Sequence, residues 1–323
     1  MVLVIVDNSD GVIDDLTFQA LTLGRQLAAD SGQPLEALVT GDGATGAAAG
    51  LGSYGVTTAH VVVHPQMSGF APAATARAAA QLVGQGSVRA VVASGSGRSN
   101  EVMAHLGAMT DQPVAADCLT VTLGAPTTVT RARWGGSLVE EAVLHADIAL
   151  LTVAPHAVAA ETVDGVSAAV VPFTPELEAV DLAVHAVPAT TVESSGAVSL
   201  ADAKVIVSGG RGVGSAEGFA VLEELAGLLG GTIGCSRVVT GNGWRPHKEQ
   251  VGQTGTKVAP DLYIACGISG ATQHLAGCRN SKTILVINND AEAPIMGHAD
   301  YAVIGDLHKI LPAIIEETRK AKA

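Results

Sequence analysis

The sequence predicts an α/β protein built from two doubly wound, Rossmann-like domains. In both halves of the chain, short apolar runs rich in Val and Ile alternate with segments of helical spacing. The length of 323 residues suits two domains of ordinary size. Hydrophobic residues make up 48% of the chain and charged residues 15%, which is enough apolar material for a sizeable core.

The first domain is expected over residues 1–190. Its strands are continuously apolar, which predicts a parallel sheet covered by helices on both faces. Helical spacing predicts a helix over Asp15–Asp30, and Ala-rich stretches predict further helices. After Asp111 the apolar runs leave no room for helices, so we expect additional strands, some of them antiparallel. The strands expected before that point are Val2–Asp7, Leu35–Thr40, Ala59–His64 and Val88–Ser94.

A linker is expected over about 155–200, where Pro, Ser, Thr and Ala are frequent, with one strand at Val180–Val187. The second domain is expected over 200–323 and repeats the alternation of strands and helices. Ser215 is a good N-cap for a helix that ends near residue 229. The other elements expected here are strands at Val205–Ser208, Leu262–Cys266, Thr283–Ile287 and Tyr301–Asp306, a helix from about Ala271, and the closing amphipathic helix LHKILPAIIEETRK.

The composition excludes several classes of function. The net charge of −13 argues against nucleic-acid binding, which needs a basic surface. No window approaches the length of uninterrupted apolar sequence that a membrane-spanning helix needs. The start MVLVIVDNSDG lacks the basic segment of a targeting signal, so a cytoplasmic location is expected. The cysteines form no C-x-x-C pair and are expected to be buried free thiols: Cys118, Cys235, Cys266 and Cys278.

Two glycine-rich turns follow predicted strands. SGGRGVGSAEGF (Ser208–Phe219) allows the backbone to pass close to a ligand, and the helix expected after Ser215 would direct its free N–H groups toward an anion. Arg211 adds a guanidinium group suited to phosphate oxygens. We therefore expect phosphate or pyrophosphate binding at this turn, with a tight turn and a solvated arginine as the alternative. SGSGRSN matches G-x-G-x-x-G only in part and is expected to be a plain strand-to-helix connection.

The segment GISGA raises a competing hypothesis, because it nearly matches the G-x-S-x-G turn of α/β serine hydrolases. Ser269 would be the nucleophile, Asp290 or Asp300 the acid and His308 the base. Three features argue against this. The last glycine of the motif is an alanine, no HGGG-like oxyanion segment is present, and Arg211 has no task in ester hydrolysis.

The stretch VGQTGTKVAPDLYIACGISGATQHLAG carries mild hydrogen-bonding groups on glycine-rich turns, without a carboxylate pair or a metal-ligand cluster. These groups are Gln253, Thr254, Ser269, Gln273 and His274. They suit a flat, electron-carrying ligand that performs its own chemistry while the protein orients it. A lone histidine on a helix is more often structural, but the closeness of His274 to Ser269 and Gln273 favours a ligand contact.

The same stretch, together with SKTILVINNDAEAPI and ADYAVIGDL, strongly resembles the FAD-binding domain of the electron-transfer flavoprotein alpha subunit. SGGRGVGSAEGF and GCSRVVTGNGW resemble earlier motifs of that family, in the same order. The resemblance runs from about Lys204 to the C-terminus, and the first domain is similar only in layout. It implies FAD as the cofactor and electron transfer, rather than catalysis on a substrate of its own.

The resemblance also implies which residues contact FAD. Arg211 would contact it from the glycine turn, Arg237 would bring positive charge near the flavin ring, Thr254 would lie near N5 and His274 near the C2 carbonyl. The adenosine end would be held by Asn288, Asp306 and Leu307. The full expected set is Arg211, Ser236, Arg237, Val251, Gly252, Gln253, Thr254, Ser269, Gly270, Ala271, Thr272, Gln273, His274, Asn288, Asp306 and Leu307.

The family resemblance implies a heterodimer with a beta subunit that binds AMP. The complex would take electrons from dehydrogenases, such as the acyl-CoA dehydrogenases of fatty acid β-oxidation, and pass them to a quinone oxidoreductase or another acceptor. A plain interaction module with a degenerate cofactor site is a third hypothesis beside the carrier and the hydrolase. The chain departs from the family pattern at Cys235, Asn242, Thr256 and His298, which bear on the flavin potential and the partner-facing surface.

Overall fold

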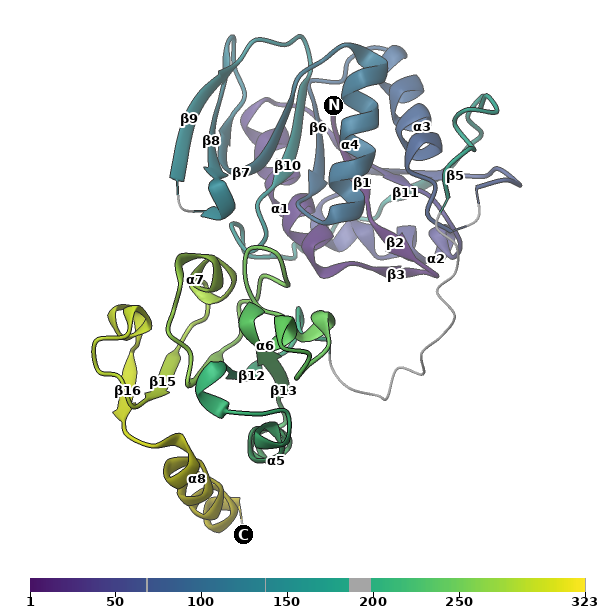
Figure 1. Cartoon of the computed structure of the whole chain (residues 1–323). Helices are drawn as coiled ribbons and strands as arrows, with labels where there is room; N and C mark the ends of the chain where they lie inside the picture. Colours follow the sequence, from purple (N-terminus) through teal and green to yellow (C-terminus); the bar gives the residue numbers. More distant parts are fainter. Residues whose placement is uncertain (68, 137, 186–198, 323) are drawn as a thin grey trace. The chain divides into compact units, whose positions relative to one another are not determined.

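The computed structural model describes residues 1–67, 69–136, 138–185 and 199–322. Internal contacts divide the chain into two compact units, and both are α/β (Figure 1). The first unit contains the described residues of 1–134 and 138–185, and the second contains residues 135–136 and those of 199–322.

The first unit is built on a nine-stranded sheet in the order β11-β5-β4-β1-β6-β10-β7-β8-β9, which is parallel from β11 to β7. Its strands are β1 (Val2–Val6), β4 (Leu35–Val39), β5 (Thr58–Val62), β6 (Ala90–Ser94), β7 (Val114–Thr122), β8 (Thr127–Arg133), β9 (Leu138–Leu144), β10 (Ala149–Val153) and β11 (Ala169–Phe173). Its helices are α1 (Asp15–Asp30), α2 (Ala44–Ala49), α3 (Pro72–Gly84) and α4 (Gly97–Thr110), and β2 (Asn8–Ser9) pairs with β3 (Val12–Ile13).

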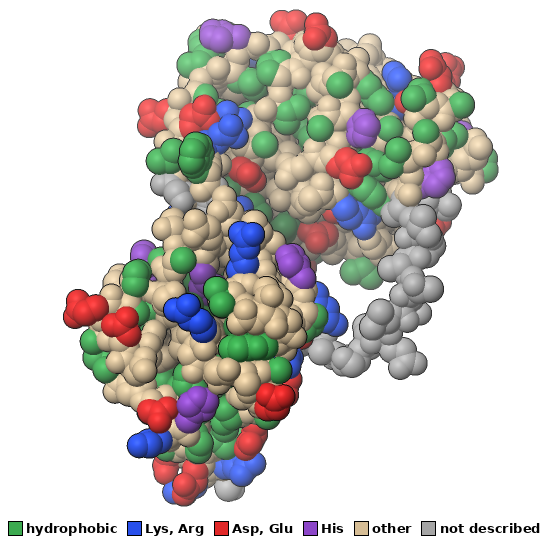
Figure 2. Space-filling model, in the orientation of Figure 1, with side chains coloured by type: hydrophobic (Ala, Val, Ile, Leu, Met, Phe, Trp, Pro, Cys, Tyr) green, Lys and Arg blue, Asp and Glu red, His purple; other side chains and the backbone are tan. Residues whose placement is uncertain are grey.

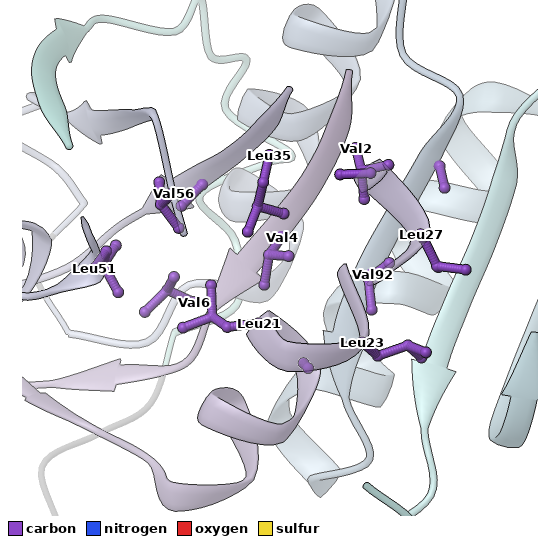
Figure 3. Packing of buried hydrophobic residues seen from close by; sticks show 14 of the residues in the cluster. Val2, Val4, Val6, Leu21, Leu23, Leu27, Leu35, Leu51, Val56 and Val92 are labelled. Carbon is purple, nitrogen blue, oxygen red and sulfur yellow. The ribbon is translucent and has the colours of Figure 1, made fainter. Parts of the chain in front are cut away.

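Strand β1 shows why this sheet needs helices on both faces. Val2, Val4 and Val6 lie on one face and pack in the same cluster as the leucines of α1 (Figure 3). Leu3 and Ile5 lie on the other face, in the cluster that includes α3 and α4. All five side chains are buried. Because successive side chains of a strand point to opposite faces, a continuously apolar strand requires cover on both sides.

The additional strands expected after Asp111 are present. Strand β7 is parallel to β10 and antiparallel to β8, and β9 is antiparallel to β8. The strand expected at Val180–Val187 is not found in its described part, because residues 179–182 form turns and residues 186–187 lie outside the described residues. Instead β11 lies within the predicted linker and pairs with β5. Pro172 argues against a strand there, but a proline is tolerated on an edge strand such as β11.

The second unit is built on a five-stranded parallel sheet in the order β13-β12-β14-β15-β16. Helices α5 and α8 pack on one face, and α7 packs on the other (Figure 1). The strands are β12 (Val205–Gly209), β13 (Thr232–Cys235), β14 (Leu262–Cys266), β15 (Ile284–Asn288) and β16 (Tyr301–Ile304). The helices are α5 (Ala220–Leu229), α6 (Arg237–Gly241), α7 (Thr272–Cys278) and α8 (Leu307–Lys322).

Two elements of the second unit differ from the sequence prediction. Strand β13 was not expected, because TIGC is short and contains a glycine, so it carries no strand pattern. The helix expected from Ser215 begins instead at Ala220, after a 3-10 turn at Glu217–Phe219. Ser215 Oγ accepts a hydrogen bond from the backbone N–H of Gly218 at 3.2 Å, so its side chain caps that turn rather than α5.

The cysteines of this chain are buried free thiols. All four cysteines are buried and free, and burial raises the pKa of each thiol to about 12, so they stay protonated. Within the described residues, no group of three or more His, Cys, Asp and Glu side chains is arranged to hold a metal ion. None of the helices described has the length and apolarity needed to cross a bilayer.

Candidate functional site

A cavity of about 710 Å³ lies in the second unit, at the carboxyl ends of its parallel strands. The segments that follow β12, β13, β14 and β15 all contribute to its wall, together with the loop at residues 250–254 and helix α7. A cavity of this size is in the range of small-molecule and cofactor sites.

The strand order explains where the cavity lies. Because β12 has β13 on one side and β14 on the other, the connections after β12 and β14 diverge and leave a crevice outside the strand ends. Gly212 N donates to Gly267 O at 3.0 Å, and a Cβ on Gly212 would lie only 2.7 Å from Gly267 Cα. Backbone without side chains is therefore needed at this contact. Since α5 begins at Ala220, away from the cavity wall, the anion-facing helix expected after Ser215 is absent.

Arg211 and Arg237 bring positive charge to the cavity. Both are exposed, and within the described residues neither forms an ion pair, whereas nearby Arg245 is held by Glu223 and Glu249. In Figure 2, Lys, Arg and His side chains of this unit lie around α6 and α7, and charged side chains of both signs lie around α5 and α8. In a chain of net charge −13, two unpaired guanidinium groups at one cavity favour an anionic ligand.

Hydrogen bonds hold the loop at residues 250–254 in place. Gln253 N donates to Gln273 O of α7 at 2.7 Å. The buried Gln250 side chain accepts from Thr240 of α6 at 2.7 Å and donates to Thr254 Oγ1 at 2.9 Å. The loop is thus tied to two helices, and the Thr254 hydroxyl has a defined position at the cavity.

His274 is a buried histidine on the cavity wall, with only 6% of its surface exposed. Its Nε2 lies 2.9 Å from the Tyr263 hydroxyl. Burial lowers the pKa of His274 to about 4, partly offset by the backbone of Val251, so the ring is neutral near pH 7. Its Nδ1 is buried and makes no hydrogen bond of standard geometry within the described part of the chain. Leaving such an atom unpaired costs about 1–3 kcal/mol, which a ligand can recover.

Most of the residues singled out from the sequence lie on the wall of this one cavity. They are Arg211, Ser236, Arg237, Val251, Gly252, Gln253, Thr254, Ser269, Gly270, Ala271, Gln273, His274 and Asn288. Three others lie outside its described lining. Thr272 is exposed at the start of α7, Asp306 accepts from the backbone N–H of His308 at the start of α8, and Leu307 is buried in the core.

Sequence reasoning left part of the lining out of the expected FAD contacts, although Asp290 was named as a possible acid of the hydrolase hypothesis. Asn289 and Asp290 extend the polar end of β15, and this NND run after a buried strand is a signal that was available. Gln250 gave no signal, because its role depends on contacts with α6. The missed residues are Gly212, Val238, Gln250, Gly267, Ile268, Asn289, Asp290 and Ala293.

Ser269 lies at the cavity, but its surroundings differ from those of a hydrolase nucleophile. In α/β serine hydrolases, the nucleophilic serine sits on a sharp, strained strand-to-helix turn. Here the positive φ angles fall on Gly267 (60°) and Gly270 (82°) and not on Ser269. Within the described residues no hydrogen bond joins Ser269 to His308, and the Asp300 carboxylate accepts a backbone N–H instead. The hydrolase hypothesis therefore has no support in this geometry.

Two family models match the chain. The electron transfer flavoprotein domain matches residues 2–179, and the electron transfer flavoprotein FAD-binding domain matches residues 199–279. The chain belongs to the electron transfer flavoprotein alpha subunit family. The match to the first domain goes beyond the likeness of layout that its sequence suggested.

Several alpha subunits of this family are similar to this chain, some over nearly its full length and some over part of it. The subunit from Thermoanaerobacterium thermosaccharolyticum is 33% identical over 99% of this chain and 98% of its own length. The subunit from Bacillus subtilis is 31% identical over 99% of this chain and 97% of its own length. The subunit from Clostridium acetobutylicum is 57% identical over 122 residues, which cover 38% of this chain and 36% of its own length.

The family establishes FAD as the cofactor, and the residues around the cavity fit it. Arg211 and Arg237, which form no ion pair among the described residues, suit an anionic ligand such as FAD. The close glycine turns at Gly212 and Gly267 let the backbone reach a ligand directly. The buried Nδ1 of His274 needs a hydrogen-bond partner, which the polar edge of a flavin can provide.

Proposed function

We propose that this chain is the FAD-carrying subunit of a heterodimeric electron carrier. Its partner is a beta subunit that binds AMP. The complex accepts electrons from dehydrogenases, such as acyl-CoA dehydrogenases, and passes them to a quinone oxidoreductase or another acceptor. The observation that carries this proposal is the cavity at the carboxyl ends of the strands of the second unit. Uncharged hydrogen-bonding side chains line it, together with two arginines that form no ion pair among the described residues. Such a site orients a cofactor that brings its own redox chemistry.

In this proposal the chain holds and tunes FAD, which supplies the electron transfer when bound. Arg211 contacts the cofactor from the turn after β12, and Arg237 places a positive charge near the flavin ring. Thr254 lies near N5 and His274 near the C2 carbonyl. A cation or an N–H donor at the ring favours the reduced flavin, which carries negative charge.

We assign all the residues expected from the sequence to the proposed cofactor site, including the three that do not line the cavity. Leu307 packs closely against the turn at Gly267, because a Cβ on Gly267 would lie 2.9 Å from Leu307 Cδ2. Asp306 fixes the start of α8 beside it. Thr272 is the first residue of α7, directly before Gln273 and His274. Asn288 at the end of β15 holds the adenosine end.

Co-expression with a beta subunit of the same family tests the proposal. The purified heterodimer is expected to be yellow and to release FAD on denaturation. Anaerobic mixing with an acyl-CoA substrate and its dehydrogenase should bleach the flavin, and a quinone oxidoreductase with its quinone should restore the colour. A colourless, folded heterodimer that takes up no added FAD would refute the electron-carrier proposal. Bound FAD that no dehydrogenase reduces would refute the assigned donors only.

A further inference from the structure

Tyr263 of β14 is a buried polar neighbour of His274. It is fully buried, and its hydroxyl lies 2.9 Å from His274 Nε2. The two ring centres are 6.2 Å apart and the planes are tilted by 52°, so the contact is a hydrogen bond rather than a stack. Tyr263 does not line the cavity, and sequence reasoning assigned it no role.

The direction of this hydrogen bond follows from the states of the two groups. Burial raises the pKa of Tyr263 well above its usual value, so the phenol keeps its hydrogen and needs an acceptor. Within the described residues, His274 Nε2 is the acceptor that lies in standard geometry. Ser208 is also buried near the phenol, but its Oγ makes no such hydrogen bond. A neutral imidazole that accepts at Nε2 carries its own hydrogen on Nδ1.

We propose that Tyr263 is a positioning residue, which holds His274 in the Nδ1–H tautomer and so makes its Nδ1 a hydrogen-bond donor to the cofactor. This inference rests on the proposed function, in which His274 contacts the flavin. The opposite tautomer would present a lone pair at Nδ1, which repels a carbonyl oxygen. The buried Nδ1, which makes no hydrogen bond of standard geometry among the described residues, is the atom that gains a partner when FAD binds.

The tautomer itself is measured by nitrogen NMR of the heterodimer labelled with ¹⁵N-histidine, before and after removal of FAD. The His274 signal is assigned by its loss in His274→Asn. We expect a protonated Nδ1 and an unprotonated Nε2 in both states, and a mixture of tautomers in Tyr263→Phe. A wild-type protein with the hydrogen on Nε2 would overturn the proposal, because the phenol would then donate elsewhere.

FAD affinity tests whether the tautomer matters for the cofactor. We expect Tyr263→Phe to weaken FAD binding about tenfold, which corresponds to about 1.4 kcal/mol. His274→Asn places an amide N–H near the position of Nδ1, and His274→Gln places it near Nε2, so the Asn variant should bind FAD more tightly than the Gln variant. Tyr263→Phe should add no further loss in the His274→Asn background. Tyr301→Phe, at an exposed tyrosine of β16, is the matched control and should bind FAD as the wild type does.

The outcomes separate this inference from the proposed function. If the wild-type heterodimer binds FAD and Tyr263→Phe binds it equally tightly, the proposed function stands and the inference fails. The inference also fails if His274→Gln retains FAD better than His274→Asn, because Nε2 would then be the contacting atom. If the wild type binds no FAD at all, the proposed function fails, and with it the donor role of His274.

Discussion

At the scale of single residues, the charge of Arg237 should have a direct effect on the flavin potential. The side chain is exposed at the start of α6 and has no carboxylate partner among the described residues. We expect Arg237→Ala to lower the reduction potential, because loss of about 1–2 kcal/mol corresponds to about 20–40 mV for two electrons. Spectroelectrochemical titration of the FAD-loaded heterodimer measures the shift. Arg237→Lys keeps the charge and should keep most of the potential, and an unchanged potential in Arg237→Ala would contradict the proposed placement.

The buried His274 should make stability depend on pH. Its pKa is lowered from 6.5 to about 4 in the folded chain, so between these values the unfolded chain binds a proton that the folded chain does not. The free energy of unfolding should therefore rise with pH across this window, by up to about 3 kcal/mol from this group. Urea denaturation of wild type and His274→Asn at several pH values isolates the effect as their difference. A difference that stays constant from pH 4 to pH 7 would contradict a buried, neutral His274.

At the scale of elements, the contact between α7 and the loop at residues 250–254 should control FAD binding. A Cβ on Gly277 of α7 would lie 2.3 Å from Gly252 N, so Gly277→Ala must push the loop away. Overpacking of this kind costs about 1–3 kcal/mol, and we expect FAD affinity to fall about tenfold or more. Flavin fluorescence titration of the heterodimer measures the loss.

Gly227 provides the matched control for that substitution. It also lies within a helix, α5, but a Cβ there would meet nothing within 4 Å. Gly227→Ala should stabilise the chain by about 0.5–1 kcal/mol and leave FAD affinity unchanged. Equal FAD affinity in the two alanine variants would show that the α7 contact does not position the loop.

At the scale of the whole molecule, we propose that residues 1–190 and 200–323 are separately folding domains, because each unit has its own hydrophobic clusters. Leu222→Ala and Leu21→Ala each truncate a fully buried leucine, one in each unit, at a cost of about 2–5 kcal/mol. Each should shift only one of two transitions in the denaturation of the full chain. A single transition that both substitutions shift equally would contradict independent domains.

Two elements with a strong local pattern were predicted to the residue. The helix Asp15–Asp30 and the strand Leu262–Cys266 have the predicted bounds, because a helical period and a continuous apolar run are properties of the segment itself. Strands β11 and β13 escaped prediction, because AVVPF contains a proline and TIGC is short and contains a glycine. Both become strands by pairing in the sheet, β11 with β5, which lies far away in the sequence, and β13 with the preceding strand β12.

The sequence by itself determined the α/β class, the family and its FAD, and most residues of the candidate site. These follow from local features, namely apolar strands that end in glycine-rich, polar turns and motifs that span consecutive residues. Only the tertiary structure decided that these turns meet at one cavity, that Gln250 links α6 to Thr254, and that Tyr263 directs its hydroxyl to His274. Strand order and side-chain pairing across the sheet determine these contacts, and a local sequence pattern specifies neither of them.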